Sequence, residues 1–404
     1  MKKEFTYPKI FFVLNLLMAF VMFLNIIIVK KKIDMHLFIL IISYFFLVII
    51  NRILNSLLFD VDEILNLIIN IFILISIVIL YRISNNVALK QMIFIIIGYF
   101  IYFLFMFFVK DISVFYKFKW IYFILTFFLM SLSFLFGKYV NGSKNWISLF
   151  GITFQPSEFG KIFLIFYISS VLRDNRSKKD KYVSMFLLLC IILFLVLQKD
   201  LGTALIVFLV SMLMYYMKTF KYKFLLFSFI STLIGGIVAY NKFSHVRVRI
   251  SAWLNPERDP NGASYQVLQG FFSMGSGGFL GRGLYKGNLE FIPVNYTDYI
   301  FVSIVEEFGI IMGILIVTLY FLFFIRVFRR SVLIKKNFES VLLILGLIVL
   351  ISFQAILILG GILNLIPLTG VTLPFISYGG SSIISMFIMF AIIQKVLEGI
   401  KVYD

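Results

Sequence analysis

Apolar runs of about 20 residues follow one another along almost the whole of this 404-residue chain. One such run is long enough to cross the hydrocarbon core of a bilayer as an α-helix. The sequence is 62% hydrophobic and only 14% charged, whereas a soluble domain is near half apolar and about a quarter charged. A single globule cannot bury that excess, which excludes soluble, disordered, collagen-like and disulfide-scaffold proteins. The sequence predicts an all-α, polytopic transmembrane helical bundle.

Twelve segments are predicted to span the membrane, and only Gln198-Lys199-Asp200 separates two of them, which predicts an interrupted hairpin. We expect a single integral membrane domain over residues 1–404. We also expect the first helix to be retained, because its long apolar run lacks the small-residue site of a cleaved signal peptide. The predicted spans are Ile10–Val29, Leu37–Phe59, Ile64–Tyr81, Met92–Val109, Trp120–Phe136, Phe159–Leu172, Val183–Leu197, Leu201–Met217, Phe224–Tyr240, Tyr299–Ile325, Val341–Ile362 and Ile383–Val396.

The positions of the basic residues predict the orientation of the chain. Cytoplasmic loops carry an excess of Lys and Arg. With the N-terminus and the C-terminus both inside, the cytoplasmic segments hold 21 of these residues and the short outer segments hold 9. The Lys30–Lys32 cluster and the acidic turn at residues 60–63 oppose this assignment locally. The total favours a multi-pass protein with both termini in the cytoplasm.

The net charge of +18 also bears on the partners of the chain. Because the basic residues lie in short loops between apolar runs, they fit anionic lipid headgroups better than nucleic acid. No nucleic-acid-binding signature is present, so we expect no nucleic acid partner. The single Cys190 can form no internal disulfide, and the isolated His36 and His245 predict no zinc site.

Three long polar segments interrupt the apolar pattern, at Gly137–Lys161, Asn241–Asp298 and Asn364–Ser382. All three face the outside in the predicted topology, and residues 241–298 form a large extracytoplasmic loop. Long structured loops in compact proteins usually carry function. We therefore expect the chemistry of this chain at the outer membrane face.

Five groups of motifs follow one another in these polar segments and at the ends of the neighbouring spans. Such an ordered set is far more specific than any single short motif. The groups are Asn141-Gly142-Ser143-Lys144-Asn145-Trp146-Ile147 with Phe154-Gln155-Pro156-Ser157-Glu158 and Lys161; Gln198 with Asp200-Leu201-Gly202-Thr203-Ala204; Pro256, Asp259-Pro260, Gly262, Tyr265-Gln266 and Gln269; Gly275-Ser276-Gly277-Gly278, Gly281, Gly283-Leu284, Pro293, Thr297–Phe301 and Glu306-Glu307; and Pro374–Ser382.

These motifs resemble those of the SEDS family, the RodA, FtsW and SpoVE proteins of bacterial wall synthesis, from roughly residue 92 to the C-terminus. Two positions depart from the family pattern. Lys199 stands where the family usually has proline, and Tyr296 stands where it often has histidine. The family core usually has ten helices, so residues 1–60 are expected to form an extra N-terminal hairpin.

The resemblance implies a peptidoglycan glycosyltransferase in the bacterial cytoplasmic (inner) membrane. It would polymerise lipid II, an undecaprenyl-diphosphate-linked donor, into β-1,4 glycan at the outer face, with inversion at the anomeric carbon. Its expected partners are lipid II, a class B penicillin-binding transpeptidase and other membrane proteins of elongation or division. The Leu284–Gly287 segment is more similar to RodA and the Thr372–Ser377 segment to FtsW, which leaves elongation, division and sporulation roles open.

Asp259 is the candidate catalytic base. It lies between Arg258 and Pro260, with Gly262 shortly after, so a turn would present its carboxylate outside any helix. From the residues alone, an aspartate that only caps its own turn is the more common case. The resemblance assigns the catalytic role to Asp259, because the aspartate that carries this role in the family matches this position. Glu257 is close by but does not match the motif.

The leaving diphosphate needs cations or oriented N–H groups. Arg249 and Arg282 are the preferred pair and Lys286 is a third candidate, although any of them can be a solvated loop cation. Gln266 belongs to the same motif, and Trp253 either anchors at the membrane interface or stacks on a sugar. A divalent cation, Mg or Mn, would assist the diphosphate, but no ligand cluster in the sequence requires a metal.

Further polar residues lie in or near the spans, where an unpaired charge is costly. Glu158 and Lys161 are three residues apart and share a helix face, so they form either a structural ion pair or part of a substrate pocket. Glu306 and Glu307 point about 100° apart on a helix, so they are not expected to share one contact, and at least one should face a polar cavity. The other candidates are Asp200 and Asp298, whose simplest role is helix capping, and Ser377 in the last motif.

Two other functions stay open at this point. A lipid II flippase should place its binding groups at the bilayer midplane on interrupted helices, and Glu306 and Glu307 keep that alternative in play. A non-catalytic scaffold of the division or elongation machinery is the third possibility, and the intact Asp259 weighs against it. The gathering of polar motifs at the outer end favours the enzyme.

Overall fold

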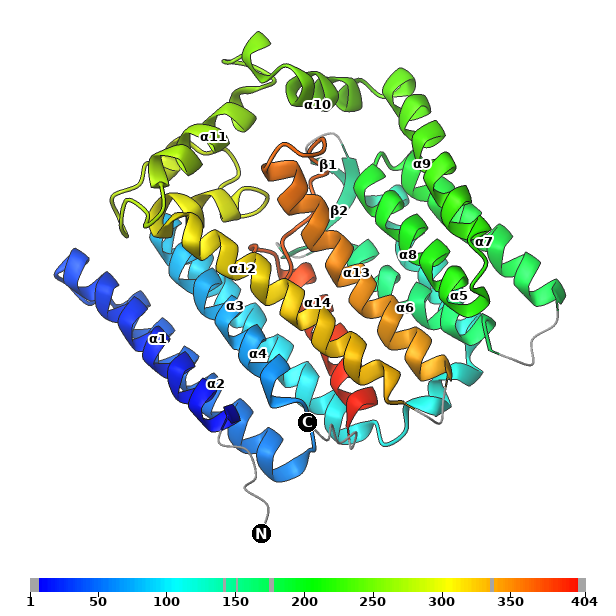
Figure 1. Cartoon of the computed structure of the whole chain (residues 1–404), viewed down its shortest axis with the longest axis horizontal. Coiled ribbons are helices and arrows are strands. Elements are labelled where there is room, and N and C mark those ends of the chain that lie inside the picture. Colours follow the sequence, from blue (N-terminus) through cyan, green and yellow to red (C-terminus); the bar gives the residue numbers. More distant parts are fainter. Residues whose placement is uncertain (1–6, 141–142, 150–151, 174–177, 335–337, 399–404) are drawn as a thin grey trace.

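The computed structural model describes residues 7–140, 143–149, 152–173, 178–334 and 338–398. This part of the chain forms twelve long helices and two shorter ones, α10 and α11, with one small sheet. The long helices run side by side, and α10 and α11 lie at the end opposite the two termini (Figure 1). The long helices are α1 (Tyr7–Lys30), α2 (Met35–Leu58), α3 (Glu63–Ile83), α4 (Asn85–Phe108), α5 (Lys119–Phe136), α6 (Pro156–Val171), α7 (Lys178–Leu197), α8 (Leu201–Thr219), α9 (Lys223–Lys242), α12 (Ile300–Val332), α13 (Phe338–Ile362) and α14 (Gly380–Leu397).

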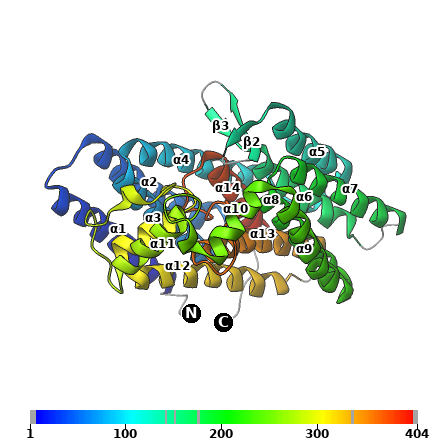
Figure 2. The ribbon, with the colours of Figure 1, turned by 90° about the horizontal axis from the view of Figure 1, so that it is seen from above.

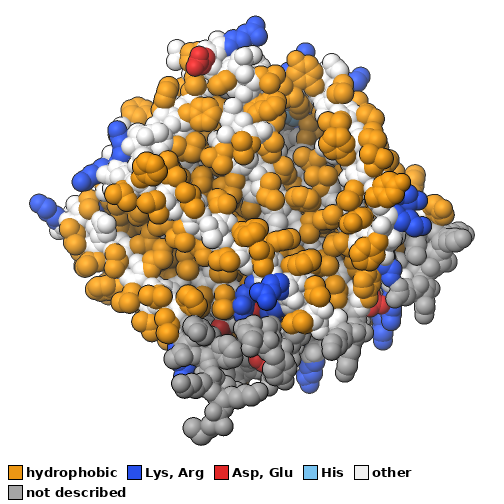
Figure 3. All heavy atoms as spheres, in the orientation of Figure 1, with side chains coloured by type: hydrophobic (Ala, Val, Ile, Leu, Met, Phe, Trp, Pro, Cys, Tyr) orange, Lys and Arg blue, Asp and Glu red, His pale blue; other side chains and the backbone are white. Residues whose placement is uncertain are grey.

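Each predicted span coincides with one of these helices, and the polytopic all-α fold is confirmed. Ten helices in the described residues are long and apolar enough to cross a membrane, while α6 and the apolar part of α7 have 16 residues each. Hydrophobic side chains cover most of the face in Figure 3, and Lys and Arg gather at its edges. That distribution is expected where lipid, rather than water, contacts the sides of the bundle.

Burial separates the centre of the bundle from its periphery. In the most apolar window of α3, 89% of residues are buried, and the values for α13 and α14 are both 72%, but in α9 only 6% are buried. Seen from above, α14 lies in the middle, with α1 and α2 towards one end and α5, α7 and α9 towards the other (Figure 2). The hairpin of α1 and α2 packs on α3 and α4.

The three polar segments, called outer after the predicted topology, contain elements that the sequence pattern did not predict. Strands β1 (Lys138–Val140), β2 (Ser143–Leu149) and β3 (Ile152–Phe154) form an antiparallel sheet in the order β1-β2-β3. Residues 241–298 contain α10 (Ser244–Leu254) and α11 (Tyr265–Gly277), with the short 3₁₀ helices η2 (Pro256–Arg258) and η3 (Leu289–Phe291). A further 3₁₀ helix, η1 (Ile112–Lys117), precedes α5 at the other end. The first two motif residues, Asn141 and Gly142, lie outside the described residues.

Helix α12 is interrupted at Gly309, where the backbone has φ 82° and ψ 171°. A Cβ atom at this position would lie 2.2 Å from the carbonyl oxygen of Phe279, so only glycine fits. The N–H of Ile310 donates to the carbonyl of Gly278 over 2.9 Å, which ties the break to the end of α11. The short first part of α12 therefore ends against the outer loop before the rest of the helix crosses the bundle.

Candidate functional site

Helix α10 is held over the end of the bundle opposite the two termini, which is called the outer end after the predicted topology, by the segment that follows α13. The guanidinium Nη1 of Arg249 donates to the carbonyls of Leu368 and Thr369, over 3.2 and 3.1 Å. The indole N–H of Trp253 donates to the carbonyl of Asn364 over 2.9 Å, and the amide of Asn364 donates back over 3.1 Å. Arg249 and Trp253, both predicted to bind substrate, thus also fasten α10 to this segment.

Arg249 also faces a carboxylate, Asp298, across Gly370. A Cβ atom at Gly370 would lie 3.4 Å from Arg249 Nη2 and 3.8 Å from Asp298 Oδ2. Loss of solvation raises the pKa of Asp298 to about 6, and the positive charge of Arg249 opposes this shift. Loss of solvation likewise lowers the pKa of Arg249 from its ordinary value. The N-cap position of α12 is Tyr299 and has no side-chain cap hydrogen bond, so the simple capping role does not describe Asp298.

Asp200 brings three of the sequence motifs together. One carboxylate oxygen accepts hydrogen bonds from the side-chain amides of Asn145 and Gln155, over 3.1 and 3.4 Å. The other accepts the N–H of Thr203 over 3.2 Å, which caps α8 as expected for an aspartate at this place. The negative charge of Asp200 raises the pKa of Arg249 and so opposes the lowering caused by loss of solvation. The segments around residues 145, 155, 200 and 249 therefore converge at the outer end.

Asp259, the predicted base, lies in the exposed connection between η2 and α11. One carboxylate oxygen accepts the backbone N–H of Ala263 over 2.8 Å, which fixes the side chain in a turn. A Cβ atom at Gly262 would lie 2.3 Å from Asp259 Oδ2, so a larger residue there would make the carboxylate shift. The side chain is exposed, as is that of Glu257, while Gln266 on α11 is partly buried. The carboxylate is presented at the surface, and its catalytic role stays a prediction.

Glu306 and Glu307 contact the same stretch of the outer loop, but each accepts the N–H of a different residue. Glu307 Oε2 accepts the N–H of Tyr285 over 2.6 Å, and Glu306 Oε1 accepts the N–H of Asn288 over 2.8 Å. Both carboxylates approach Gly287 between these residues. The loop therefore folds back over the first part of α12, so that two consecutive carboxylates of this helix both reach it.

Arg82 is a residue of this region that sequence reasoning missed. Its Nε donates to Glu307 Oε1 over 2.9 Å and its Nη2 donates to the carbonyl of Gly287 over 2.9 Å. Arg282 reaches Glu306 only at 3.8 Å, and Arg282 and Lys286 are both exposed. No sequence signal links Arg82 to Glu307, because 225 residues separate them.

The buried pair on α6 lies below this outer layer. Lys161 Nζ donates to Glu158 Oε1 over 2.7 Å, and the hydroxyl of Ser385 on α14 donates to Glu158 Oε2 over 3.2 Å. Ser377 makes two hydrogen bonds to the backbone. Its hydroxyl donates to the carbonyl of Thr297 over 2.7 Å and accepts the N–H of Leu373 over 3.0 Å. Both contact sets join α14, or the loop before it, to other elements.

The arrangement consists of two charged groups at the outer end. Arg249, Asp298 and Asp200 form one, and Arg82, Arg282 and the two glutamates form the other. The two arginines preferred for the diphosphate thus belong to different groups, each near a different acid. Within the described ranges, no three His, Cys, Asp or Glu side chains are grouped closely enough to hold a metal ion. Asp259 is an exposed carboxylate next to the exposed Arg258 in the chain, and its hydrogen bond to Ala263 joins it to neither group.

Comparisons with known proteins agree on one family. The model of the FtsW/RodA/SpoVE family, described as cell cycle protein, matches residues 67–401. The peptidoglycan glycosyltransferase RodA of Mycobacterium tuberculosis (strain ATCC 25618 / H37Rv) is 34% identical over 277 residues, which cover 65% of this chain and 59% of that protein. The probable peptidoglycan glycosyltransferase FtsW of Wigglesworthia glossinidia brevipalpis is 35% identical over 280 residues, which cover 66% and 73%. This chain therefore matches about three fifths of the length of the RodA relatives.

Solved structures share the fold. A chain from the work "Structural coordination of polymerization and crosslinking by a peptidoglycan synthase complex" has a TM-score of 0.72 and 24% identity, and the match covers 83% of this chain and 97% of that one. The crystal structure of the Thermus thermophilus rod shape determining protein RodA has a TM-score of 0.63 and 22% identity, with 85% and 98% covered. At these identities the likeness extends to the arrangement of the helices.

Proposed function

Because this chain belongs to the FtsW/RodA/SpoVE family, we propose that it is a peptidoglycan glycosyltransferase that polymerises lipid II at the outer face of the bacterial cytoplasmic membrane. Relatives that are named peptidoglycan glycosyltransferases, at 34 and 35% identity, support the activity. In the proposed orientation both termini lie in the cytoplasm, and α10 and α11 lie on the outer side.

The reaction needs one proton acceptor and a stabilised leaving group. The acceptor sugar hydroxyl loses its proton to a carboxylate as its oxygen bonds to the anomeric carbon of the donor, and the bond from that carbon to the diphosphate oxygen breaks. A single displacement converts the α-linked lipid II into a β-1,4 linkage. Diphosphate leaves as an anion, so cations assist its departure and no general acid is required.

The observation that carries the proposal is the exposed carboxylate of Asp259, held in its turn by the N–H of Ala263 over 2.8 Å. A base must reach its proton within hydrogen-bond distance, and a fixed, exposed side chain can do so without unfolding its surroundings. Arg249 also supports the proposal, because it is a cation of the same loop region whose Nη1 makes two backbone hydrogen bonds while Nη2 lies 3.4 Å from the Cβ position of Gly370.

The test is polymerisation by the purified full-length protein in lipid nanodiscs. Labelled lipid II is added with Mg²⁺ or Mn²⁺, with EDTA, and with or without a class B penicillin-binding transpeptidase. The proposal predicts long glycan that a muramidase digests to disaccharide units. Absence of glycan under every condition, with lipid II moved across a sealed bilayer instead, would favour the flippase alternative.

We also propose that the chain works with a transpeptidase. The similar fold in a peptidoglycan synthase complex supports this partner. Co-purification of the two membrane proteins after expression together tests the proposal, and separate elution at all detergent concentrations would contradict it. The polymerase assay above gives a second readout, since a cognate partner should raise the yield of glycan.

A further inference from the structure

The N-terminal hairpin of α1 and α2 precedes the residues matched by the family model, which begins at residue 67. Its turn, Lys30–Asp34, lies at the same end of the bundle as the outer loop. Asp34 caps α2 by accepting the N–H of Leu37 over 2.8 Å, and Lys30 is the last residue of α1. Two charged side chains from the segment that precedes the family match are therefore fixed at this end of the bundle.

These two residues meet the end of α3 in a compact hydrogen-bond cluster. The hydroxyl of Tyr81 accepts from Lys30 Nζ over 2.7 Å and donates to Asp34 Oδ2 over 2.7 Å. Asn85 at the start of α4 donates to the same carboxylate oxygen over 3.4 Å, and Lys30 forms an ion pair with Asp34 over 3.4 Å. Every group in the cluster has a partner of complementary charge or polarity.

The cluster continues to the outer loop through Tyr285. Lys30 Nζ lies 5.4 Å from the centre of the Tyr285 ring, and the guanidinium carbon of Arg82 lies 4.8 Å from it. Both distances are within the range of a cation–π interaction. The backbone of Tyr285 has φ 67°, a conformation that a tyrosine rarely adopts without support, and its N–H is held by Glu307. The cation of the hairpin turn thus lies beside a loop residue, Tyr285, whose backbone has a positive φ.

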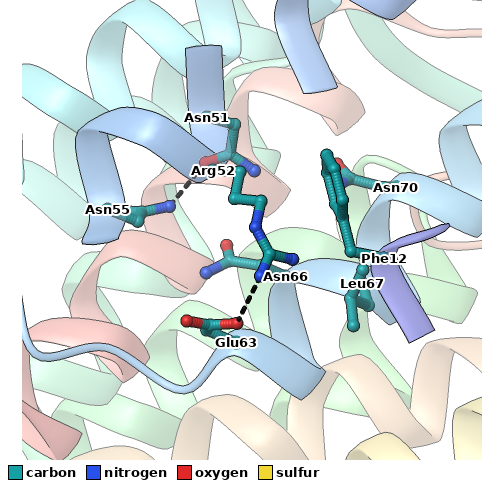
Figure 4. A pocket seen from close by; sticks show the side chains of 8 residues that line it. All are labelled: Phe12, Asn51, Arg52, Asn55, Glu63, Asn66, Leu67 and Asn70. Atoms are coloured by element: carbon teal, nitrogen blue, oxygen red, sulfur yellow. Dashed lines mark hydrogen bonds and ion pairs between the residues drawn. The ribbon is translucent and has the colours of Figure 1, made fainter. Parts of the chain in front are cut away.

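The hairpin is also anchored towards its other end. Figure 4 shows Arg52 of α2 extended towards Glu63 of α3, with Phe12 of α1 and several asparagines around a small cavity of about 20 Å³. The Arg52–Glu63 ion pair measures 3.6 Å, and the guanidinium carbon lies 4.2 Å from the Phe12 ring centre. Polar contacts between membrane helices fix their register. With both ends attached to α3, the hairpin can transmit a fixed position to its turn.

We propose that Lys30 and Asp34 are positioning residues, which hold Tyr81 and Tyr285 and so fix the loop Arg282–Asn288, which carries the cations Arg282 and Lys286. The inference rests on the proposed function, because the loop matters only if its cations meet the substrate. A displaced loop should weaken lipid II binding more than the chemical step. The KM for lipid II is therefore expected to rise about three- to tenfold in a variant that breaks the cluster, with kcat changed by less than about twofold.

The experiment compares K30M, which removes the charge but keeps the length, with K32M in the same turn. Lys32 is exposed and contributes no contact to the cluster. Lys30→Arg should rescue most of the effect, because it restores a cation, and Tyr81→Phe should reproduce the loss by removing only the bridging hydroxyl. Hydrogen–deuterium exchange of residues 279–291 in nanodiscs supplies a readout that is independent of activity.

We expect faster exchange of this loop and a higher KM in K30M and Y81F, with both values unchanged in K32M. Unchanged loop exchange in K30M and Y81F overturns the coupling, and faster exchange with an unchanged KM overturns the positioning role. Faster exchange throughout α3 and α4 would instead show general destabilisation and also count against the proposal. Wild-type protein without polymerase activity would overturn the proposed function, while the exchange comparison would still decide whether the hairpin holds the loop.

Discussion

Arg249 and Asp298 both lie against Gly370, so that a Cβ atom there would be 3.4 Å from the guanidinium and 3.8 Å from the carboxylate. The two charges come from α10 and from the residue before Tyr299, and the glycine belongs to the segment between α13 and α14. Three parts of the chain that are far apart in sequence thus depend on one small residue.

Gly370→Ala is expected to lower both stability and polymerase activity. The residue has φ 75°, which costs an alanine about 1–2 kcal/mol, and the added methyl group would contact both Arg249 and Asp298. Thermal unfolding in detergent and glycan yield measure the two effects. Gly236→Ala on α9 is the matched control, because nothing lies within 4 Å of its Cβ position. Equal behaviour of the two variants would contradict this account of the site.

Asp298 should make stability depend on pH. Because its pKa of about 6 lies above its ordinary value of 3.8, the folded state binds more protons than the unfolded state between about pH 4 and 6. The contribution of this group to the free energy of unfolding is therefore greatest at low pH and falls as the pH rises through 6. Asp298→Asn should be more stable than wild type at pH 7.5, by about 1–3 kcal/mol at most, and the difference should vanish near pH 4. A constant difference from pH 4 to 7.5 would contradict the assignment.

The buried pair on α6 should respond more to single than to double substitution. Lys161→Met leaves Glu158 as an unpaired buried charge, which typically costs about 3–5 kcal/mol. Glu158→Gln together with Lys161→Met removes both charges and should recover much of that loss. The unfolding temperatures of Lys161→Met, Glu158→Gln and the double variant measure this. A double variant less stable than both single variants would exclude a coupled pair. Lys90→Met on α4 is the control for the loss of one cation, because Lys90 is exposed.

The sequence was sufficient to predict the helices but not the order in the outer layer. Each span is an apolar run whose length matches the bilayer, so hydropathy alone located it. The strands β1 and β3 have three residues each, too few for an alternating pattern to be recognised. Helices α10 and α11 lie in a polar region where neither length nor hydropathy distinguishes helix from loop.

The charged site was only partly predictable for a physical reason. Spacing of three residues suffices to place Glu158 and Lys161 on one helix face. Arg82, Lys30 and Tyr285 meet only through tertiary packing, so no local pattern singles them out. Glu306 and Glu307 reach different N–H groups of one loop, and helix spacing alone does not predict that this loop folds back over both.

Polymerisation of labelled lipid II by Asp259→Asn, with Glu257→Gln beside it, tests the central claim most directly. Both carboxylates are exposed and two residues apart, so the pair controls for charge and folding. We predict that Asp259→Asn lowers the rate of glycan synthesis at least about 100-fold, with unchanged protein level and lipid II binding. Glu257→Gln should retain nearly the full rate. Normal polymerisation by Asp259→Asn would contradict its assignment as the base.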